Sequence, residues 1–368
     1  MKVLVTGAYG FVGRNLVEKL KESTDYKLTL IDKDDSKEDL VKGILSADFI
    51  FHLAGVNRPE REEEFFEGNS GLTGEIIKIL KDNKKTTPLL ISSSIQAELD
   101  NPYGKSKKKA EEEVFSYGKE AGARVYVYRL PNVFGKWCRP NYNSAVATFC
   151  HNIARDEEVW VSDPSKEMNL VYIDDVVRCF IDSMKSEKKI ESYAHVDLVY
   201  KVTLGKIVEL LNFFKDSRRT LMVPNMEEEF SKKLYSTYLS YLPEDKFSYP
   251  LKMNVDNRGS FTEILKSKDR GQVSVNISKP GITKGNHWHH TKNEKFLVVN
   301  GEGLIRFRKI GCEEIIEYKV CGEKLEVVDI PVGYTHSIVN TGNTDLVTIM
   351  WVNEIFNPEQ PDTIFLEV

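Results

Sequence analysis

The sequence lacks most features that mark secreted, membrane-bound or nucleic-acid-binding proteins. Its five cysteines among 368 residues form no C-x-x-C pair, which excludes a disulfide framework and favours reduced thiols. No apolar run is long enough to span a bilayer, and the opening MKVLVTGAYG is not a secretory signal. The formal net charge is −5 without a block of basic and aromatic residues, so nucleic-acid binding is not favoured. We therefore expect a cytoplasmic protein with no membrane or nucleic-acid partner.

The length favours two domains, because one hydrophobic core seldom fills a chain of this size. The hydrophobic content of 41% and the charged content of 29% are those of an ordinary globular protein. The pattern changes around Asn212–Lys252, where a charged segment precedes the aromatic stretch YSTYLSYLPEDKFSYPL. We interpret this segment as a packed connection, or alternatively as a last helix and a loop of the first domain. The expected domains are residues 1–245 and 246–368.

The first domain alternates strand and helix patterns, which is typical of a parallel sheet with helices on its faces. Short β-rich runs are expected to form the strands: Val3–Thr6, Lys27–Asp32, Phe49–Leu53, Leu89–Ser93 and Val125–Leu130. Longer periodic segments are expected to form helices: Gly13–Lys21, Gly71–Lys81 and Ser106–Glu120.

The second domain has almost no helix signal. Short strand candidates separated by Gly, Pro or Asn recur from Met253 onward: Gln272–Ser278, Glu294–Asn300, Gly303–Arg308, Glu313–Val320, Lys324–Ile330 and Val347–Val352. This spacing predicts a small antiparallel barrel or jelly roll.

A glycine-rich loop joins the first strand to the first helix. It runs Gly7-Ala8-Tyr9-Gly10-Phe11-Val12-Gly13. Glycines at this place let the backbone approach a pyrophosphate, which then lies at the helix N-terminus. The loop predicts a Rossmann-like, doubly wound sheet that binds a dinucleotide through Gly7, Tyr9, Gly10, Phe11, Val12 and Gly13.

Asp32 closes the second strand. A carboxylate there accepts hydrogen bonds from ribose hydroxyls, which suits NAD, and repels the 2′-phosphate of NADP. Lys33 beside it offsets part of that repulsion. The residues alone leave the choice between NADH and NADPH open.

Further motifs resemble those of the extended short-chain dehydrogenase/reductases, in order over about half of the chain. They are His52-Leu53-Ala54-Gly55, Asn69, Ser92-Ser93-Ser94, Tyr103-Gly104-Lys105-Ser106-Lys107, Arg129 to Gly135 and Tyr172 to Val176. The resemblance implies that Leu53, Ala54 and Gly55 contact the cofactor, that Ser94, Tyr103 and Lys107 are catalytic, and that Asn132 contacts the substrate.

Tyr103 and Lys107 are four residues apart and therefore share one face of a helix. A nearby ammonium lowers the pKa of a phenol, so we expect Lys107 to make Tyr103 a usable proton donor to a substrate carbonyl. Lys107 is also expected to hold the nicotinamide ribose, and Ser94 to hydrogen-bond the same carbonyl oxygen.

The second domain carries His287, His289, Glu294 and His336. Residues two apart on a strand face the same side, so His287 and His289 can bind one ion. Glu294 and His336 complete three nitrogen ligands and one oxygen ligand. Zn²⁺ is our first choice, although Fe²⁺, Mn²⁺, Ni²⁺ and Cu²⁺ also suit such a set.

The histidine–glutamate pattern resembles the two cupin motifs, except that Leu325 stands where the second motif has glycine. The whole chain is similar to the CapF-type bifunctional enzymes of bacterial capsule biosynthesis. This resemblance implies a homodimer whose cupin epimerises C3 of a UDP-2-acetamido-2,6-dideoxy-4-hexulose. Its reductase would then use NADPH at C4 to give UDP-2-acetamido-2,6-dideoxy-L-talose, on the route to UDP-N-acetyl-L-fucosamine.

Two alternatives stay open at this point. In the first, only the reductase is active and the cupin is a dimerisation or sugar-binding module. In the second, the chain is a redox-sensing regulator that binds the dinucleotide without turnover, a reading that the Ser94, Tyr103 and Lys107 set disfavours. The residues do not identify the base that removes the C3 proton.

Overall fold

A computed structural model describes residues 1–188 and 192–368. The chain forms two compact units, the first made of Met1–Leu211 with Glu228–Leu242 and the second of Asn212–Glu227 with Pro243–Val368. The division falls inside helix α8 (Leu204–Thr220). The expected boundary between residues 245 and 246 stays a prediction. In the structure the chain passes from the first unit to the second after Leu211, returns at Glu228 and passes again after Leu242.

The first unit is built on a five-stranded parallel sheet in the order β2-β1-β3-β4-β5. The strands are β1 (Lys2–Thr6), β2 (Lys27–Ile31), β3 (Phe49–His52), β4 (Leu89–Ser94) and β5 (Val125–Leu130). Their apolar residues are buried on both faces, as in a sheet that helices cover on both sides.

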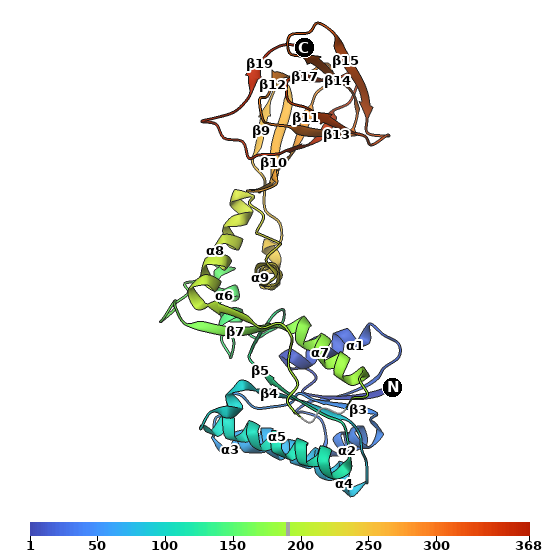
Figure 1. Ribbon diagram of the computed structural model, residues 1–368, viewed down its shortest axis with the longest axis vertical. Coiled ribbons are helices and arrows are strands. Elements are labelled where there is room, and N and C mark those ends of the chain that lie inside the picture. Colours follow the sequence, from blue (N-terminus) through green and yellow to red (C-terminus); the bar gives the residue numbers. More distant parts are fainter. Residues whose placement is uncertain (189–191) are drawn as a thin grey trace. The chain divides into compact units, whose positions relative to one another are not determined.

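Helices cover both faces of this sheet, which confirms the doubly wound α/β fold. Helices α1 (Phe11–Lys21) and α7 (Ile173–Lys185) contact each other on one face, while α2 (Lys37–Ser46), α4 (Leu72–Asp82) and α5 (Pro102–Ala121) cover the other (Figure 1). Because β1 lies between β2 and β3, the chain reverses direction across the sheet here, where ligands of such folds bind at the carboxyl ends of the strands.

Smaller elements complete the first unit. A three-stranded sheet contains β6 (Asn132–Phe134), β7 (Glu167–Tyr172) and β8 (Tyr200–Thr203). The remaining helices are α3 (Glu63–Phe65), the π-helix η1 (Phe66–Gly71), the 3₁₀-helix η2 (Ile95–Glu98), α6 (Ala145–Ile153) and α9 (Glu229–Leu239). Among the described residues, no helix combines the length and apolar character needed to cross a bilayer.

The segment 212–252 is more helical than a connection. It contains the end of α8, all of α9 and the 3₁₀-helix η3 (Glu244–Lys246). Of the aromatic residues that suggested packing, Tyr235 and Tyr238 lie in α9, and Tyr238 and Tyr241 are buried. The segment is divided between the two units.

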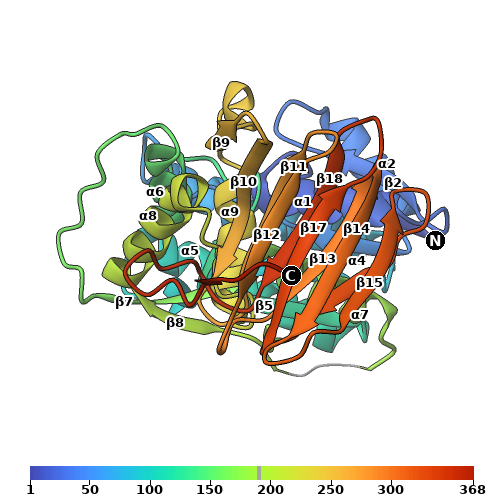
Figure 2. The ribbon, with the colours of Figure 1, turned by 90° about the horizontal axis from the view of Figure 1, so that it is seen from above.

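From Met253 onward the second unit is antiparallel β, which confirms the expected cupin-like barrel. One sheet has the order β16-β13-β18-β11-β10-β9 and the other β15-β14-β17-β12-β19 (Figure 2). The strands are β9 (Met253–Asp256), β10 (Gly259–Ser267), β11 (Gly271–Ser278), β12 (Thr283–Trp288), β13 (Glu294–Asn300), β14 (Glu302–Lys309), β15 (Ile315–Cys321), β16 (Val327–Ile330), β17 (Tyr334–Asn340), β18 (Leu346–Val352) and β19 (Ile364–Phe365).

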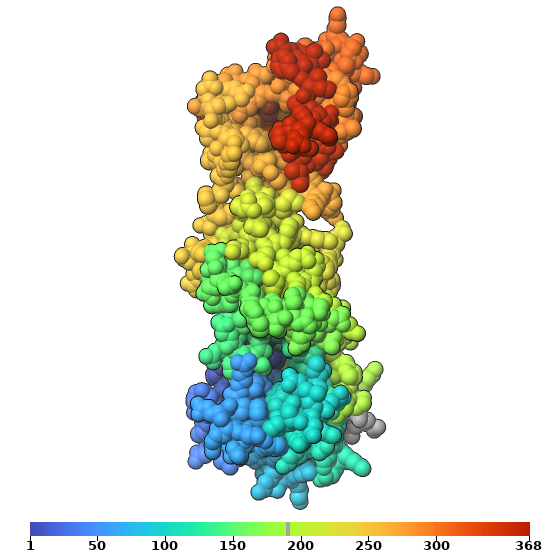
Figure 3. Space-filling view, turned by 90° about the vertical axis from the view of Figure 1, so that its left-hand side faces the viewer, coloured from blue at the N-terminus to red at the C-terminus, as the bar shows by residue number. Residues whose placement is uncertain are grey.

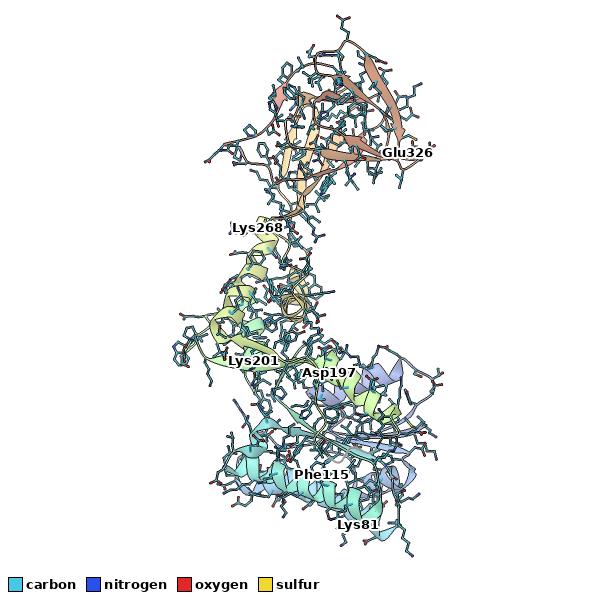
Figure 4. The ribbon with its side chains drawn as sticks, in the orientation of Figure 1. Lys81, Phe115, Asp197, Lys201, Lys268 and Glu326 are labelled. Atoms are coloured by element: carbon cyan, nitrogen blue, oxygen red, sulfur yellow. The ribbon has the colours of Figure 1, made fainter. Side chains whose placement is uncertain are left out.

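A buried ion pair fastens α5 to the parallel sheet. The carboxylate of Glu111 is fully buried and lies 2.6 Å from a guanidinium nitrogen of Arg129 on β5. It also accepts hydrogen bonds from Ser93 of β4 and from the Tyr193 hydroxyl. The ring of Tyr193 packs edge-on against Phe115 of α5, which is labelled in Figure 4, with centroids 5.4 Å apart. These contacts fix the helix that carries Tyr103 and Lys107 against two strands.

Replacing Glu111 by Gln should destabilise the first unit, because it leaves the Arg129 guanidinium without its buried charge partner. We expect a loss of about 3 kcal/mol in the free energy of unfolding, at the lower end for broken buried pairs, because Arg129 keeps an exposed partner in Glu98. Urea unfolding of the full chain checks this, with exposed Glu112→Gln as a control expected to change stability by less than about 0.5 kcal/mol. Equal midpoints for both variants would contradict the role assigned to Glu111.

Candidate functional site

The glycine loop is packed too closely for side chains at two of its glycines. Gly7 has a φ of +67°, and a Cβ on it would lie 2.6 Å from the amide nitrogen of Ala54. A Cβ on Gly13 would lie 2.0 Å from the carbonyl oxygen of Gly7. No side chain caps helix α1 at Gly10, so its first N–H groups face the loop without a protein side-chain acceptor, as a phosphate site requires.

The other residues expected to contact the cofactor surround this loop. Tyr9 is 70% exposed, while Phe11 and Val12 at the start of α1 are half-buried. The carboxylate of Asp32 accepts hydrogen bonds from the backbone N–H of Tyr9, at 3.0 Å, and of Lys33, at 2.8 Å. Asp32 therefore ties the glycine loop to the end of β2.

The segment after β3 brings the two halves of the nucleotide site together. Leu53 and Ala54 lie against Gly7. Beside them, a Cβ on Gly55 would lie 2.8 Å from Oδ1 of Asn69 and 2.9 Å from Nζ of Lys107. Asn69, in the π-helix η1, is buried and its amide bonds to the backbone of Val56 and to the Ser106 hydroxyl. The cofactor loop and the catalytic helix thus meet at Gly55.

Tyr103 and Lys107 lie one turn apart on α5, whose first turn is capped by the side chain of Asn101 accepting from the Gly104 N–H at 2.7 Å. Tyr103 is half-buried and packs edge-on against Phe65. The Lys107 ammonium is buried and donates to the carbonyl oxygen of Ser92 at 3.4 Å. The structure therefore places the expected catalytic side chains at the carboxyl end of β4.

The expected decrease in the pKa of Tyr103 is wrong, because its pKa is raised. Burial raises the pKa of Tyr103, and the hydrogen bond with Ser94 lowers it only in part. Lys107 does not produce the expected decrease because its ammonium is directed at Ser92. Burial lowers the pKa of Lys107 itself to about 8, against the opposing charge of Glu111. The phenol is protonated at neutral pH, as an ordinary tyrosine is, and burial makes it a weaker acid than the sequence led us to expect.

Asn132 belongs to a different part of the first unit. It lies on β6 of the three-stranded sheet, is exposed, and its amide donates to the carbonyl oxygen of Asn169 at 3.5 Å. Its expected contact with the substrate stays a prediction. His52, by contrast, is buried between the hydroxyls of Thr6 and Thr73.

The barrel brings the four expected metal ligands together. One ligand atom from each of His287, His289, Glu294 and His336 lies within 4.8 Å of the others. Strands β12, β13 and β17 carry three of them, and His289 follows β12 directly. The rings of His287 and His336 are 4.6 Å apart, because these two residues are register partners.

The donor atoms of this group fit a metal ion. Nε2 of His289, Oε2 of Glu294 and both ring nitrogens of His336 are buried without a hydrogen-bond partner among the described residues. The Nε2 of His336 comes within 3.1 Å of Oε2 of Glu294 without forming a hydrogen bond. Unpaired buried polar atoms are costly, and three imidazoles with one carboxylate are a ligand set that Zn²⁺ accepts.

Electrostatics favour the metal-binding form of His287 and Glu294. Burial lowers the pKa of His287 to about 4, assisted by the charge of His336. Burial acts to raise the pKa of Glu294, but the neighbouring imidazoles of His289 and His336 outweigh it and lower that pKa to about 2. For His289, burial acts to lower the pKa, but the Glu294 carboxylate and the Asp362 carbonyl outweigh it and raise that pKa. At neutral pH the carboxylate is ionised and His287 is neutral, as metal ligands must be.

Asp362, near the C-terminus, supports this group and was not expected from sequence. Its carbonyl oxygen accepts a hydrogen bond from Nδ1 of His289, which leaves Nε2 with its lone pair for a metal. Its carboxylate accepts from the backbone N–H of His290, Thr291 and Lys292 at 2.9–3.0 Å. It adopts a φ of +38°, unusual for a residue with a side chain. No local motif marks this position.

A cavity of about 750 Å³ opens beside the four residues, inside the second unit. Residues of β9, β10, β11 and β12 line it together with the metal group and the segment that contains Glu354, Phe356 and Thr363. Figure 3 shows a hollow in the barrel between the gold early strands and the red C-terminal segment. The volume is within the usual range for small-molecule sites.

Comparisons with known families match both units. The NAD dependent epimerase/dehydratase family matches residues 3–198, and the polysaccharide biosynthesis C-terminal domain matches residues 254–364. A nicotinamide dinucleotide is thus the cofactor of the first unit's family. A structure of UDP-glucuronic acid 4-epimerase from Bacillus cereus, in complex with NAD, is 18% identical with a TM-score of 0.56 and shares the fold over 66% of this chain and 98% of that chain.

Two relatives match nearly the full length. The chain is 49% identical to the UDP-2-acetamido-2,6-beta-L-arabino-hexul-4-ose reductase of Pseudomonas aeruginosa, over 99% of this chain and 98% of that protein. It is 58% identical to the capsular polysaccharide assembling protein CapF from Staphylococcus aureus, whose crystal structure covers 100% of both chains with a TM-score of 0.95. The chain therefore belongs to the NAD dependent epimerase/dehydratase family, and within it to the two-part CapF-type proteins that end in a polysaccharide biosynthesis C-terminal domain.

Proposed function

We propose that this chain is a bifunctional nucleotide-sugar enzyme of capsular polysaccharide biosynthesis. Its barrel epimerises C3 of UDP-2-acetamido-2,6-dideoxy-4-hexulose, and its first unit then reduces the C4 ketone with NADPH to give UDP-2-acetamido-2,6-dideoxy-L-talose, on the route to UDP-N-acetyl-L-fucosamine. One observation carries the proposal: the Ser94, Tyr103 and Lys107 group and the barrel cavity with its histidines occur in one chain that matches a 4-keto-sugar reductase end to end.

Reduction needs a proton donor beside the cofactor. A bound nicotinamide supplies the hydride. The Tyr103 phenol is protonated at neutral pH, as an ordinary tyrosine is, and it donates its proton to the C4 oxygen. Ser94 holds that oxygen by a hydrogen bond. Lys107, one turn along α5 and close to Gly55, holds the nicotinamide ribose.

The cofactor is proposed to be NADPH, with NADH also accepted. Both oxygens of the Asp32 carboxylate are engaged by backbone N–H groups of Tyr9 and Lys33. These bonds neutralise part of the charge that would repel a 2′-phosphate. The ammonium of Lys33 adds to the same effect.

Epimerisation at C3 suits the barrel because the neighbouring C4 ketone makes the C3 proton acidic. The four ligands are proposed to hold Zn²⁺, which when bound polarises a ketone or braces the barrel. The cavity beside them is large enough for the sugar. The proposal further expects a cytoplasmic homodimer, as the family resemblance implies.

Replacing Tyr103 by Phe should reduce the rate of C4 reduction by about 10²- to 10⁴-fold, the usual contribution of a positioned acid. NADPH oxidation with the 4-keto sugar measures this rate. NADPH affinity, measured by fluorescence titration, should change little because the ring and its packing on Phe65 remain. Reduction at the unaltered rate would show that another group donates the proton.

The Tyr103→Phe chain also isolates the first step. Incubated with the 4-keto sugar in D₂O, it should incorporate deuterium at C3, detected by mass spectrometry and NMR. His289→Ala in the same background should lose this exchange, since it removes a proposed metal ligand. If the unaltered ligand set gives no deuterium at C3, the barrel is instead a dimerisation or sugar-binding module.

Replacing Asp362 by Ala should weaken Zn²⁺ binding by about 10-fold, because alanine keeps the carbonyl that orients His289 but loses the carboxylate bonds that hold this segment against residues 290–292. Competition with a chromophoric chelator measures the affinity. His290→Ala is the matched control, because His290 is exposed and packs on Trp288 instead. Asp362→Asn should recover part of the affinity, since its single amide oxygen can still accept from the N–H groups of Thr291 and Lys292 and asparagine tolerates positive φ. Equal affinities in the Ala variant and the control would refute a role for Asp362 in metal binding.

A further inference from the structure

Strand β11 turns its polar residues into the barrel and its apolar residues outward. Gln272, Ser274, Asn276 and Ser278 are buried at 4%, 0%, 4% and 0% exposure, whereas the intervening Val273, Val275 and Ile277 are half-buried. The inward positions of a small barrel are normally apolar, because side chains fill its interior. This inversion marks β11 as the wall of a site for a polar ligand.

The polar wall occupies only one side of the barrel interior. Phe296, Val298, Ile305 and Phe307 fill the side around β13 and β14 as an apolar core. Cross-strand register joins the two sides, since Phe296 pairs with Met350 and Met350 pairs with Ser274. One row along, Glu294 is joined to Gln272 through Val352. A ligand in the cavity therefore meets both the metal group and the polar wall.

The hydroxyl of Ser274 has no partner. Its Oγ is buried, has no hydrogen bond among the described residues, and its residue lines the cavity. Leaving a buried hydroxyl unpaired costs about 1–3 kcal/mol. A polar group of a ligand in the cavity is placed to satisfy it.

Lys284 faces the same cavity because β12 contains a bulge. In register with β17, Lys284 pairs with Ile338 and His287 pairs with His336, although Lys284 and His287 are three residues apart. The extra residue is accommodated by positive φ angles at Gly285 and Asn286. Without the bulge, Lys284 and His287 would face opposite sides of the strand. Both instead line the cavity.

Among residues 1–188 and 192–368, no carboxylate forms an ion pair with the Lys284 ammonium. It donates to Oδ1 of Asn276 and the carbonyl oxygen of Ile277, each at 2.8 Å, and to the carbonyl oxygen of Ser260 at 3.4 Å. The nearby charges of Asp256 and Arg258 act on it in opposite directions, and they form an ion pair with each other at 2.6 Å. A cation in this position favours a ligand oxygen that carries partial negative charge, and the long contact with Ser260 is the one most easily exchanged.

We propose that Lys284, Asn276 and Ser274 form the sugar subsite of the barrel. The subsite takes the ring of a keto sugar, with the Lys284 ammonium against the ketone oxygen and the Ser274 hydroxyl against a neighbouring ring substituent. This proposal rests on the proposed C3 epimerisation. It identifies residues outside the metal group that bind the sugar during that reaction.

The test measures the rate of deuterium incorporation at C3 against sugar concentration, in the full chain with Tyr103→Phe so that no reduction follows. Lys284→Met should raise the KM for exchange at least tenfold, and Ser274→Ala several-fold, with the zinc content unchanged. Lys324→Met is the control, because Lys324 is exposed and pairs only with Glu326; its KM should equal that of the parent chain.

The possible results distinguish failure of the proposed subsite from failure of the proposed epimerisation. A Lys284→Met chain that retains zinc and the parent KM overturns the subsite while epimerisation stands. If Lys284→Met does not fold, Ser274→Ala decides, and a KM equal to the parent's overturns the proposal. No exchange in the parent chain overturns epimerisation and the subsite together.

Discussion

The buried carboxylate of Glu111 is the contact on which the first site depends. Helix α5 carries Tyr103, Lys107 and Glu111 at intervals of one turn, so fixing one of them fixes the rotation of the helix for all three. Arg129 of β5 and Ser93 of β4 hold Glu111 from the sheet side. Tyr103 is consequently held beside Ser94, and the Lys107 ammonium beside Gly55 and Asn69. A surface ion pair would not give this rigidity, because water competes with it.

The barrel places metal ligands and a polar wall in its interior, which in a small barrel is normally apolar. The bulge in β12 turns Lys284 and His287 to one side, while the C-terminal segment reaches back to orient His289 through the carbonyl of Asp362. Both devices use backbone in the left-handed region, at Gly285, Asn286 and Asp362. Such conformations cost free energy and persist where surrounding contacts hold them.

The two sites suit consecutive steps on one ketone. In the first unit, the Tyr103 phenol, whose pKa burial raises, is protonated at neutral pH, as a proposed proton donor must be. In the second, the carboxylate of Glu294 is kept ionised and His287 neutral, which favours a bound cation. Under the proposed function, the first half would give the carbonyl a proton.

The sequence by itself determined what local spacing can encode. The glycine loop after a β-rich run, the four-residue interval between Tyr103 and Lys107, and the H-x-H pair at His287 and His289 each report contacts within one or two elements, so the doubly wound sheet, the barrel and the four-ligand cluster were predictable. Tertiary structure alone decided the rest. The pKa of Tyr103 depends on burial and on where the Lys107 ammonium points. The roles of Asp362 and Lys284 depend on a return of the chain over some seventy residues and on a one-residue bulge. Burial, long-range return and register are properties of packing between distant segments, and no short sequence pattern specifies them.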